Sequence, residues 1–176
     1  MLKIRVMPTL LYRDYGLIKG ISFDSWRHVG SLMQSIKVYN MREVDELVFL
    51  DITATDQGRS PDFDLVDDFA DECCMPLTVG GGIREVEDVR HLLAVGADKV
   101  AINTQLVENP GLVTAVSGRF GAQCVVASID FKRKDDRSCE VFTHSGRQAT
   151  GLDPVDLARE AERLGAGEIL LTSIDR

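Results

Sequence analysis

Polar residues and glycines follow several short apolar runs. In a parallel sheet, catalytic and ligand-binding residues commonly lie at these positions, where a strand ends. Here these polar residues and glycines are Asp51, Gly80, Gly81, Gly82, Asn103, Thr104, Asp130 and Asp175. If the runs are parallel strands, their carboxyl ends gather at one mouth of the fold. Any one of these residues could simply cap a loop. Three aspartates and a glycine run at corresponding ends instead favour one shared pocket.

The glycine run is typical of an anion site. Residues 78–84 lead from an apolar run into a predicted helix. Glycines allow the backbone to approach a ligand, and free N–H groups at a helix start attract negative charge. Asn103 and Thr104 follow the next run and would add side-chain donors. Because glycines can also serve a tight turn alone, the motif indicates phosphate only together with these neighbours.

The elements that must position these residues alternate between short β-branched runs and longer amphipathic segments. This alternation predicts repeated β/α units. Nearly continuous apolar runs suit parallel strands that are buried on both faces. The predicted strands cover residues 4–10, 47–51, 77–79, 99–103, 124–130 and 168–174.

Helix boundaries are also marked in the sequence. Ser60 and Asp153 each precede a proline, which predicts an N-cap followed by proline at the first helical position. Gly165 follows the second of these helices and predicts its C-terminal end. Further helices are predicted over residues 31–39 and 85–94 and from Pro110 onward.

A β-hairpin insertion is predicted beyond the fifth strand. Residues 139–147 alternate at period two behind the charged turn of residues 132–137. His144 falls in this flap. Like His28 and His91 it has no suitably spaced partner, so all three are predicted to be surface residues. Trp26 could stack on a substrate or pack on the rim of the pocket, and both interpretations stay open.

Composition excludes several classes of protein. The formal charge of −8 disfavours a nucleic-acid surface or binding to anionic lipid. The apolar runs fall short of the roughly 20 residues that cross a bilayer, and the N-terminus does not resemble a signal peptide. A cytoplasmic protein is expected. The four cysteines include no C-x-x-C pair, which predicts reduced thiols and no metal.

Several segments resemble the cyclase subunit of imidazole glycerol phosphate synthase. They are residues 47–54, 77–84, 96–100, 150–153 and 165–173. The resemblance implies an α/β fold, the (β/α)8 or TIM barrel, of which this chain would hold the first six β/α units. The chain ends at residue 176, whereas about 250 residues are typical of the fold. A single incomplete domain with exposed sheet edges is therefore expected over residues 1–176.

The resemblance also implies a reaction in histidine biosynthesis. A glutaminase subunit would form a heterodimer with this chain and send ammonia through the barrel. The ammonia would react with a phosphorylated ribulosyl aminoimidazole carboxamide, and no cofactor is implied. Asp130 would transfer protons, and Lys19 would close over the site. Gly82, Asn103 and Thr104 would bind one phosphate, with Asp51 and Asp175 also in the pocket.

A charged gate is implied at the entrance of the ammonia channel. Its residues are Arg5, Glu46, Lys99 and Glu168. Two charges of each sign can neutralise one another, which a barrel floor requires. Ordinary surface ion pairs are the alternative. Asp98 adjoins the gate and would face the glutaminase.

One position departs from the family pattern. The cyclases use two aspartates as acid and base, and Leu11 stands where the first belongs. Asp14 is not expected to replace it, because three residues further on it would point elsewhere. Two alternatives to the cyclase follow. One is an ammonia-using paralogue that amidinates a sugar for surface polysaccharide, and the other is a catalytically inactive partner-binding subunit.

Overall fold

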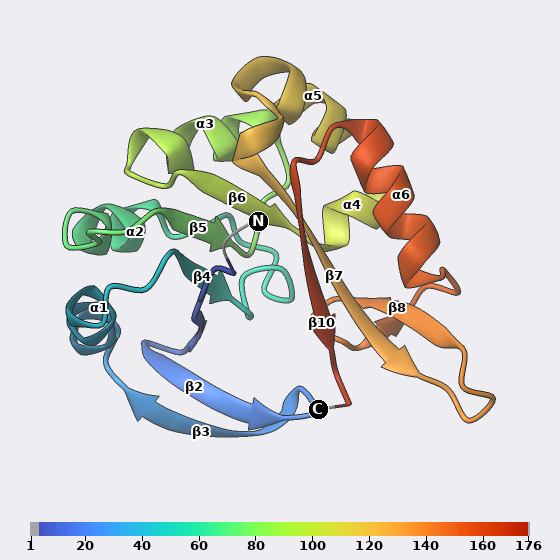
Figure 1. Ribbon diagram of the computed structural model, residues 1–176, viewed down its shortest axis with the longest axis horizontal. Coiled ribbons are helices and arrows are strands. Elements are labelled where there is room, and N and C mark those ends of the chain that lie inside the picture. Colours follow the sequence, from blue (N-terminus) through green and yellow to red (C-terminus); the bar gives the residue numbers. More distant parts are fainter. Residues whose placement is uncertain (1–3, 176) are drawn as a thin grey trace.

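Six parallel strands form the centre of the computed structural model, which describes residues 4–175 (Figure 1). They pair in chain order, and all except the first coincide closely with a predicted apolar run. Within the described residues, no pairing joins the last strand to the first, so the sheet is an open, partial barrel. The strands are β1 (Thr9–Arg13), β4 (Leu47–Asp51), β5 (Leu77–Gly80), β6 (Lys99–Ile102), β7 (Val125–Arg133) and β10 (Glu168–Ser173).

Helices cover the outer side of this sheet (Figure 1). Their apolar faces meet the strands, and Ile36, Phe69, Leu92 and Val113 are fully buried between the two layers. This arrangement explains the period of the amphipathic segments, because only one face of each helix reaches the sheet. The helices are α1 (Leu32–Met41), α2 (Phe63–Ala70), α3 (Val86–Ala94), α4 (Thr104–Glu108), α5 (Gly111–Phe120) and α6 (Pro154–Leu164).

The ends of α6 match their prediction. The Asp153 carboxylate accepts hydrogen bonds from the backbone N–H groups of Val155 at 2.8 Å and Asp156 at 3.2 Å. Gly165 ends the helix with a left-handed φ of 102°. The predicted cap of α2 is wrong by two residues. Asp62, after the buried Pro61, is the N-cap, because its carboxylate accepts from the Leu65 N–H at 3.0 Å.

The first strand lies later in the chain than predicted. Residues 4–8 form no strand, and β1 pairs with β4 through Tyr12 opposite Asp51. An unpredicted hairpin follows, made of β2 (Gly16–Ile21) and β3 (Asp24–Gly30). It is joined to β1 by a turn in which Asp14 and Tyr15 both adopt positive φ. Non-glycine residues rarely do so, and tyrosine in particular does not indicate such a turn.

The predicted flap is confirmed as a hairpin on the extended end of β7. β8 (Cys139–Thr143) pairs antiparallel with β7, and β9 (Gln148–Ala149) pairs with β8. The strand β7 is longer than expected because its carboxyl half leaves the parallel sheet to form this hairpin. The flap thus starts directly beyond Asp130.

The four cysteines are all free thiols. The described helices include none that is long and apolar enough to cross a membrane. On β10, Ile169 and Leu171 remain 45% and 56% exposed, so part of this strand is left uncovered by residues 4–175.

Replacing the cap of α6 tests the contribution of local sequence. Asp153→Ala removes the acceptor for two N–H groups and is expected to lower the free energy of unfolding by about 1 kcal/mol. Urea denaturation measures this change. Glu162→Ala, at an exposed position of the same helix, is the control and should change stability by less than about 0.5 kcal/mol. Equal effects of the two substitutions would contradict the assignment.

Candidate functional site

A cavity of about 390 Å³ lies at the carboxyl ends of the parallel strands. The structure brings five of the predicted site residues together around it: Asp51, Gly82, Asn103, Thr104 and Asp130. Two others do not line it. Lys19 is exposed on β2, and the Asp175 carboxylate instead accepts a hydrogen bond from the Arg133 N–H at 2.7 Å.

Asp130 has the electrostatics of a proton-transferring group. Burial raises the pKa of its carboxyl group from 3.8 to about 6, and a hydrogen bond from Thr172 only partly offsets this. The Asn103 amide donates to the Asp130 carboxylate at 3.1 Å and to the Ser128 carbonyl at 3.0 Å, which fixes the carboxylate beside β6. A carboxyl group with this pKa can give or take a proton near neutral pH.

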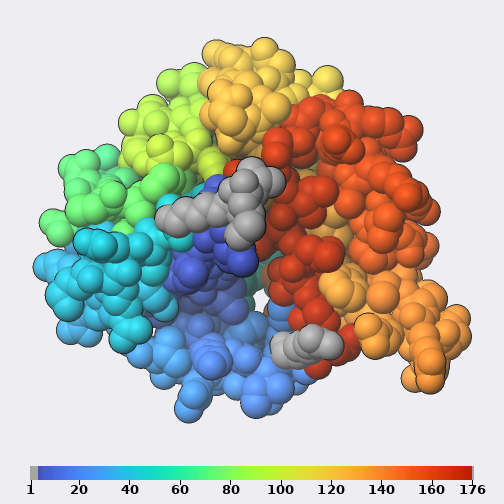
Figure 2. All heavy atoms as spheres, in the orientation of Figure 1, coloured from blue at the N-terminus to red at the C-terminus, as the bar shows by residue number. Residues whose placement is uncertain are grey.

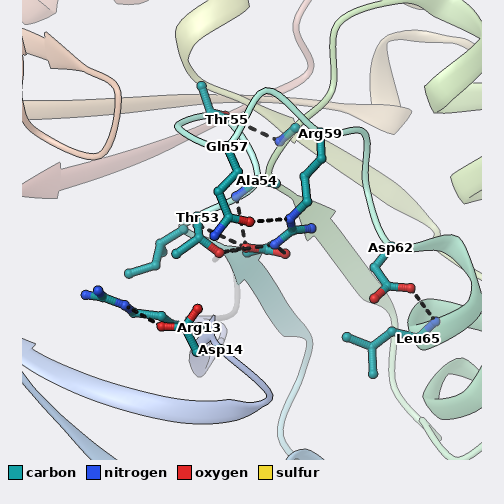
Figure 3. A network of polar contacts seen from close by, with 12 residues as sticks. Arg13, Asp14, Thr53, Ala54, Thr55, Gln57, Arg59, Asp62 and Leu65 are labelled. Atoms are coloured by element: carbon teal, nitrogen blue, oxygen red, sulfur yellow. Dashed lines mark hydrogen bonds and ion pairs between the residues drawn. The ribbon is translucent and has the colours of Figure 1, made fainter.

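Asp51 lines the same cavity, but both of its oxygens are engaged. One accepts from the Thr53 hydroxyl at 2.9 Å and from the backbone N–H groups of Thr53 and Ala54 at 3.0 and 3.1 Å. The other accepts from Arg59 at 2.6 Å, and Gln57 holds the same guanidinium at 2.8 Å. Figure 3 shows this network in the loop between β4 and α2. Asp51 therefore shapes the wall of the cavity.

The glycine run is required by packing against that loop. Gly81 and Gly82 have φ values of 112° and 74°. A Cβ atom on Gly82 would lie 2.6 Å from the Arg59 carbonyl oxygen, and one on Gly81 would collide with Asp51. The Gly82 N–H reaches only the Thr55 hydroxyl, at 3.4 Å, and so keeps capacity for a ligand.

The predicted free donors at the start of the following helix are not available. The Asp88 carboxylate accepts from the backbone N–H groups of Arg84 at 2.9 Å and Glu85 at 3.1 Å, and Glu85 caps the helix in return. Three acidic residues, Glu85, Glu87 and Asp88, occupy this end of α3 and disfavour a phosphate there. An anion in the cavity would instead meet Gly82, Asn103 and Thr104.

His144 is not the surface residue that was predicted. It lines the cavity, and only 29% of its side chain is exposed. Its backbone N–H donates to the Thr104 hydroxyl at 3.3 Å, and its ring lies 3.6 Å from the Glu108 carboxylate. The signal that could have found it was the position of the flap directly after the predicted strand of residues 124–130, which ends in Asp130.

Trp26 lines the cavity from β3. Its ring also lies against Gly20 of the neighbouring strand, where any larger side chain would collide with it. The residue therefore packs on the rim and keeps a face that a substrate could contact. His91, by contrast, is exposed and stacks on Phe63, outside the cavity.

The four predicted gate residues form one ion cluster at the amino ends of the strands. The Lys99 ammonium lies 2.8 Å from both the Glu46 and Glu168 carboxylates, and the Arg5 guanidinium lies 3.3 Å from each. Figure 2 shows the face on which the N-terminal segment, in dark blue, lies beside β10, in red. Glu46 is buried and also accepts from the Thr78 hydroxyl at 2.6 Å.

The cluster stabilises its own charges. Burial alone would lower the pKa of Lys99, but hydrogen bonds from its ammonium to Glu168 and Glu46 outweigh burial and raise that pKa. Burial would likewise raise the pKa of Glu168, but Lys99 and Arg5 outweigh burial and lower that pKa. Asp98 lies next to the cluster and is exposed. One oxygen of its carboxylate accepts a hydrogen bond from the Leu77 N–H at 2.8 Å. A role of these residues in ammonia passage stays a prediction.

Comparison with known families gives a match over nearly the whole chain. The model of a family described as "Histidine biosynthesis protein" matches residues 5–176. The match spans every strand and helix of the structure and all of the residues that line the cavity. Members of this family are TIM barrels, in agreement with the open parallel sheet.

Removing the Asp130 charge should stabilise the protein above about pH 6. The folded-state pKa, about 6, exceeds the reference value of 3.8, so the native protein holds a proton that the unfolded chain releases in that interval. Stability therefore falls as pH rises through it. Asp130→Asn is expected to raise the free energy of unfolding at pH 8 by up to about 3 kcal/mol, and to leave it nearly unchanged at pH 4.

Urea titrations at both pH values measure this difference. Asp67→Asn, at an exposed position on α2, is the control and should show no comparable pH dependence. A gain from Asp130→Asn that is the same at both pH values would show that the carboxyl group titrates normally.

Breaking the gate cluster should depend on which cation is removed. Lys99→Met leaves the buried Glu46 with less compensation, and should lower the free energy of unfolding by about 3 kcal/mol. Arg5→Met removes a half-exposed partner and should cost less than about 1 kcal/mol. In the double variant Glu46→Gln/Lys99→Met, part of the loss should be recovered. Urea denaturation measures these losses. Equal losses of unfolding free energy in the two single variants would contradict the prediction that the more buried cation contributes more stability.

Proposed function

Because the chain belongs to the histidine biosynthesis protein family, we propose that its cavity joins ammonia to a phosphorylated substrate. The reaction would be that of the cyclase subunit of imidazole glycerol phosphate synthase. The observation that carries this proposal is the placement of the ion cluster. Lys99 and Glu168 are the first residues of β6 and β10, whereas the cavity lies at the opposite ends of the same strands.

Such an arrangement suits a reactant that enters at the amino ends of the strands and reaches the cavity at their carboxyl ends. The charges of Arg5, Glu46, Lys99 and Glu168 are mutually neutralised, so they close the floor at little electrostatic cost. Ammonia is small and neutral and could pass when these pairs separate. A glutaminase subunit, which would supply the ammonia, would dock on this face beside Asp98.

At the other end, the substrate would be held by its phosphate. The Gly82 N–H, the Asn103 amide and the Thr104 hydroxyl would be its donors, as the family resemblance implies. Asp130 would exchange the proton that the addition of ammonia requires. Lys19 lies on the same hairpin as Phe23 and Trp26, which line the cavity, so a small movement of this hairpin would bring its ammonium toward the substrate.

A second candidate function is favoured by Leu11. This side chain lines the cavity beside Leu50, its partner on β4, so the middle of β1 contributes an apolar wall. Asp14 does not compensate, because it pairs with Arg13 at 3.1 Å and lies in a separate polar pocket. A cavity without this carboxylate suits an ammonia-using paralogue that amidinates a sugar in surface polysaccharide biosynthesis.

Turnover by the full-length protein with ammonium chloride separates the candidates. With the ribulosyl aminoimidazole carboxamide substrate, Asp130→Asn should lower kcat at least a hundredfold if the cyclase is the natural activity. If wild-type protein is inactive on this substrate but Leu11→Asp acquires turnover, the paralogue is supported. Leu11→Asn is the control, because it has nearly the same shape as aspartate and no carboxyl proton.

Two further results would exclude the paralogue or support the inactive partner-binding subunit. Family-level turnover by the wild-type protein, unchanged in Leu11→Asp, would exclude the paralogue. If neither protein consumes ammonium with ribulosyl or sugar substrates, the proposal of ammonia chemistry is overturned in favour of an inactive partner-binding subunit.

A further inference from the structure

Few titratable groups that line the cavity are free to exchange a proton. The Asp51 carboxylate is held by Arg59 and three further donors, and Arg84 donates to the Gly58 carbonyl at 2.8 Å. Leu11, on β1, also lines the cavity but has no proton to exchange. Asp130 and the pair of His144 with Glu108 therefore remain, and histidine is the side chain suited to proton exchange near neutral pH.

The flap is fixed in a position that keeps His144 at the cavity. The Ser145 hydroxyl donates to the Ile52 carbonyl at 2.7 Å, and Arg147 forms an ion pair with Asp56 in the same loop. Gly146 packs so closely that a Cβ atom there would lie 2.8 Å from the Phe23 ring. The tip of the flap is thus attached to the β4–α2 loop and contacts the β2–β3 hairpin, on the other side of the cavity mouth.

The turn at the tip has an unusual backbone. His144 and Ser145 adopt φ values of 51° and 55°, in the left-handed region, and Gly146 follows at 79°. Non-glycine residues adopt this conformation at an energetic cost, which the contacts of the flap must offset. The conformation presents the His144 backbone N–H to the Thr104 hydroxyl at 3.3 Å.

The imidazole ring has a polar partner near each nitrogen. Nε2 lies 3.6 Å from the Glu108 carboxylate, and Nδ1 lies 3.3 Å from the Thr143 hydroxyl. Both partners belong to elements that pack beside the cavity, α4 and β8. A carboxylate beside a histidine orients its ring, which is the geometry that a general acid or base needs.

We propose that His144 is a second proton-transferring group of this cavity, which acts on the substrate together with Asp130 and is oriented by Glu108. This inference rests on the proposed function. As ammonia nitrogen bonds to a carbonyl carbon of the substrate, the carbonyl π electrons move to oxygen, and the His144 imidazolium gives its Nε2 proton to that oxygen. Nε2 is the donor because it lies beyond hydrogen-bond distance of Glu108, whereas Nδ1 is paired with Thr143. The Asp130 carboxylate takes one proton from the added nitrogen, which leaves a neutral carbinolamine. Exchange with water then restores both residues.

The step assigns His144 a task that the apolar wall at Leu11 cannot perform. The charged groups that face the histidine or the turn that carries it are Glu108 on α4 and the pair of Asp56 and Arg147, and Asp130 lies on the wall of the same cavity. Because Glu108 contacts the ring but not the expected reacting atoms, it is a positioning residue. Its removal should weaken the reaction less than the loss of His144.

The test compares His144→Gln with His91→Gln, which changes an exposed histidine outside the cavity, in the full-length protein supplied with ammonium chloride. His144→Gln is expected to lower kcat about a hundredfold, to change KM by less than about threefold and to remove one limb of the pH–rate profile. His91→Gln should behave as wild type. Glu108→Gln should lower kcat about tenfold and shift the same limb.

A chemical rescue separates proton transfer from a structural role. Imidazole added to the buffer should restore part of the kcat of His144→Ala, and circular dichroism should show the same thermal midpoint as wild type. If His144→Gln keeps wild-type kcat, or if kcat falls without any change in the pH profile and without rescue, the inference is overturned while the proposed function stands. If wild-type protein itself has no ammonium-dependent turnover, both are overturned.

Discussion

The parallel pairing of six strands is the constraint on which the rest of the structure depends. It places the first residues of β6 and β10 at one end of the sheet, and it places Asp51 of β4, Asn103 after β6 and Asp130 of β7 at the other. An ion cluster therefore forms where the strands begin, and a cavity forms where they end. The residues of the cluster and of the cavity are distant in the sequence, and the pairing register between neighbouring strands brings them together.

Carboxylates near the sheet have different environments, and the environment decides what each can do. Asp51 receives four hydrogen bonds, so it stabilises the loop that walls the cavity. Glu46 is buried but compensated by Lys99 and Thr78. Asp130 is half-buried, and its loss of solvent contact raises its pKa more than the hydrogen bond from Thr172 lowers it. A group that costs stability in this way is available for chemistry.

The cavity is completed by two antiparallel hairpins that leave the parallel sheet. The β2–β3 hairpin contributes Phe23 and Trp26, and the flap beyond β7 contributes His144 and Ser145. They meet at Gly146, close to the end of β10. The parallel strands thus supply the rigid wall of the site, whereas the hairpins decide which side chains close over it.

The sequence by itself determined the order of the parallel strands, the cap of α6, the flap and several residues that meet in the cavity. These features follow from local periodicity, from capping residues and from the rule that parallel strands end together, whereas the residues of the ion cluster were implied by the family resemblance. The capped start of α3 and the engagement of Asp51 by Arg59 were not predicted, although each is a contact within one local segment. Tertiary structure alone decided the β2–β3 hairpin and the position of His144. The physical reason is that positive φ angles and contacts between distant segments form only when those segments pack, so local residue types do not encode them.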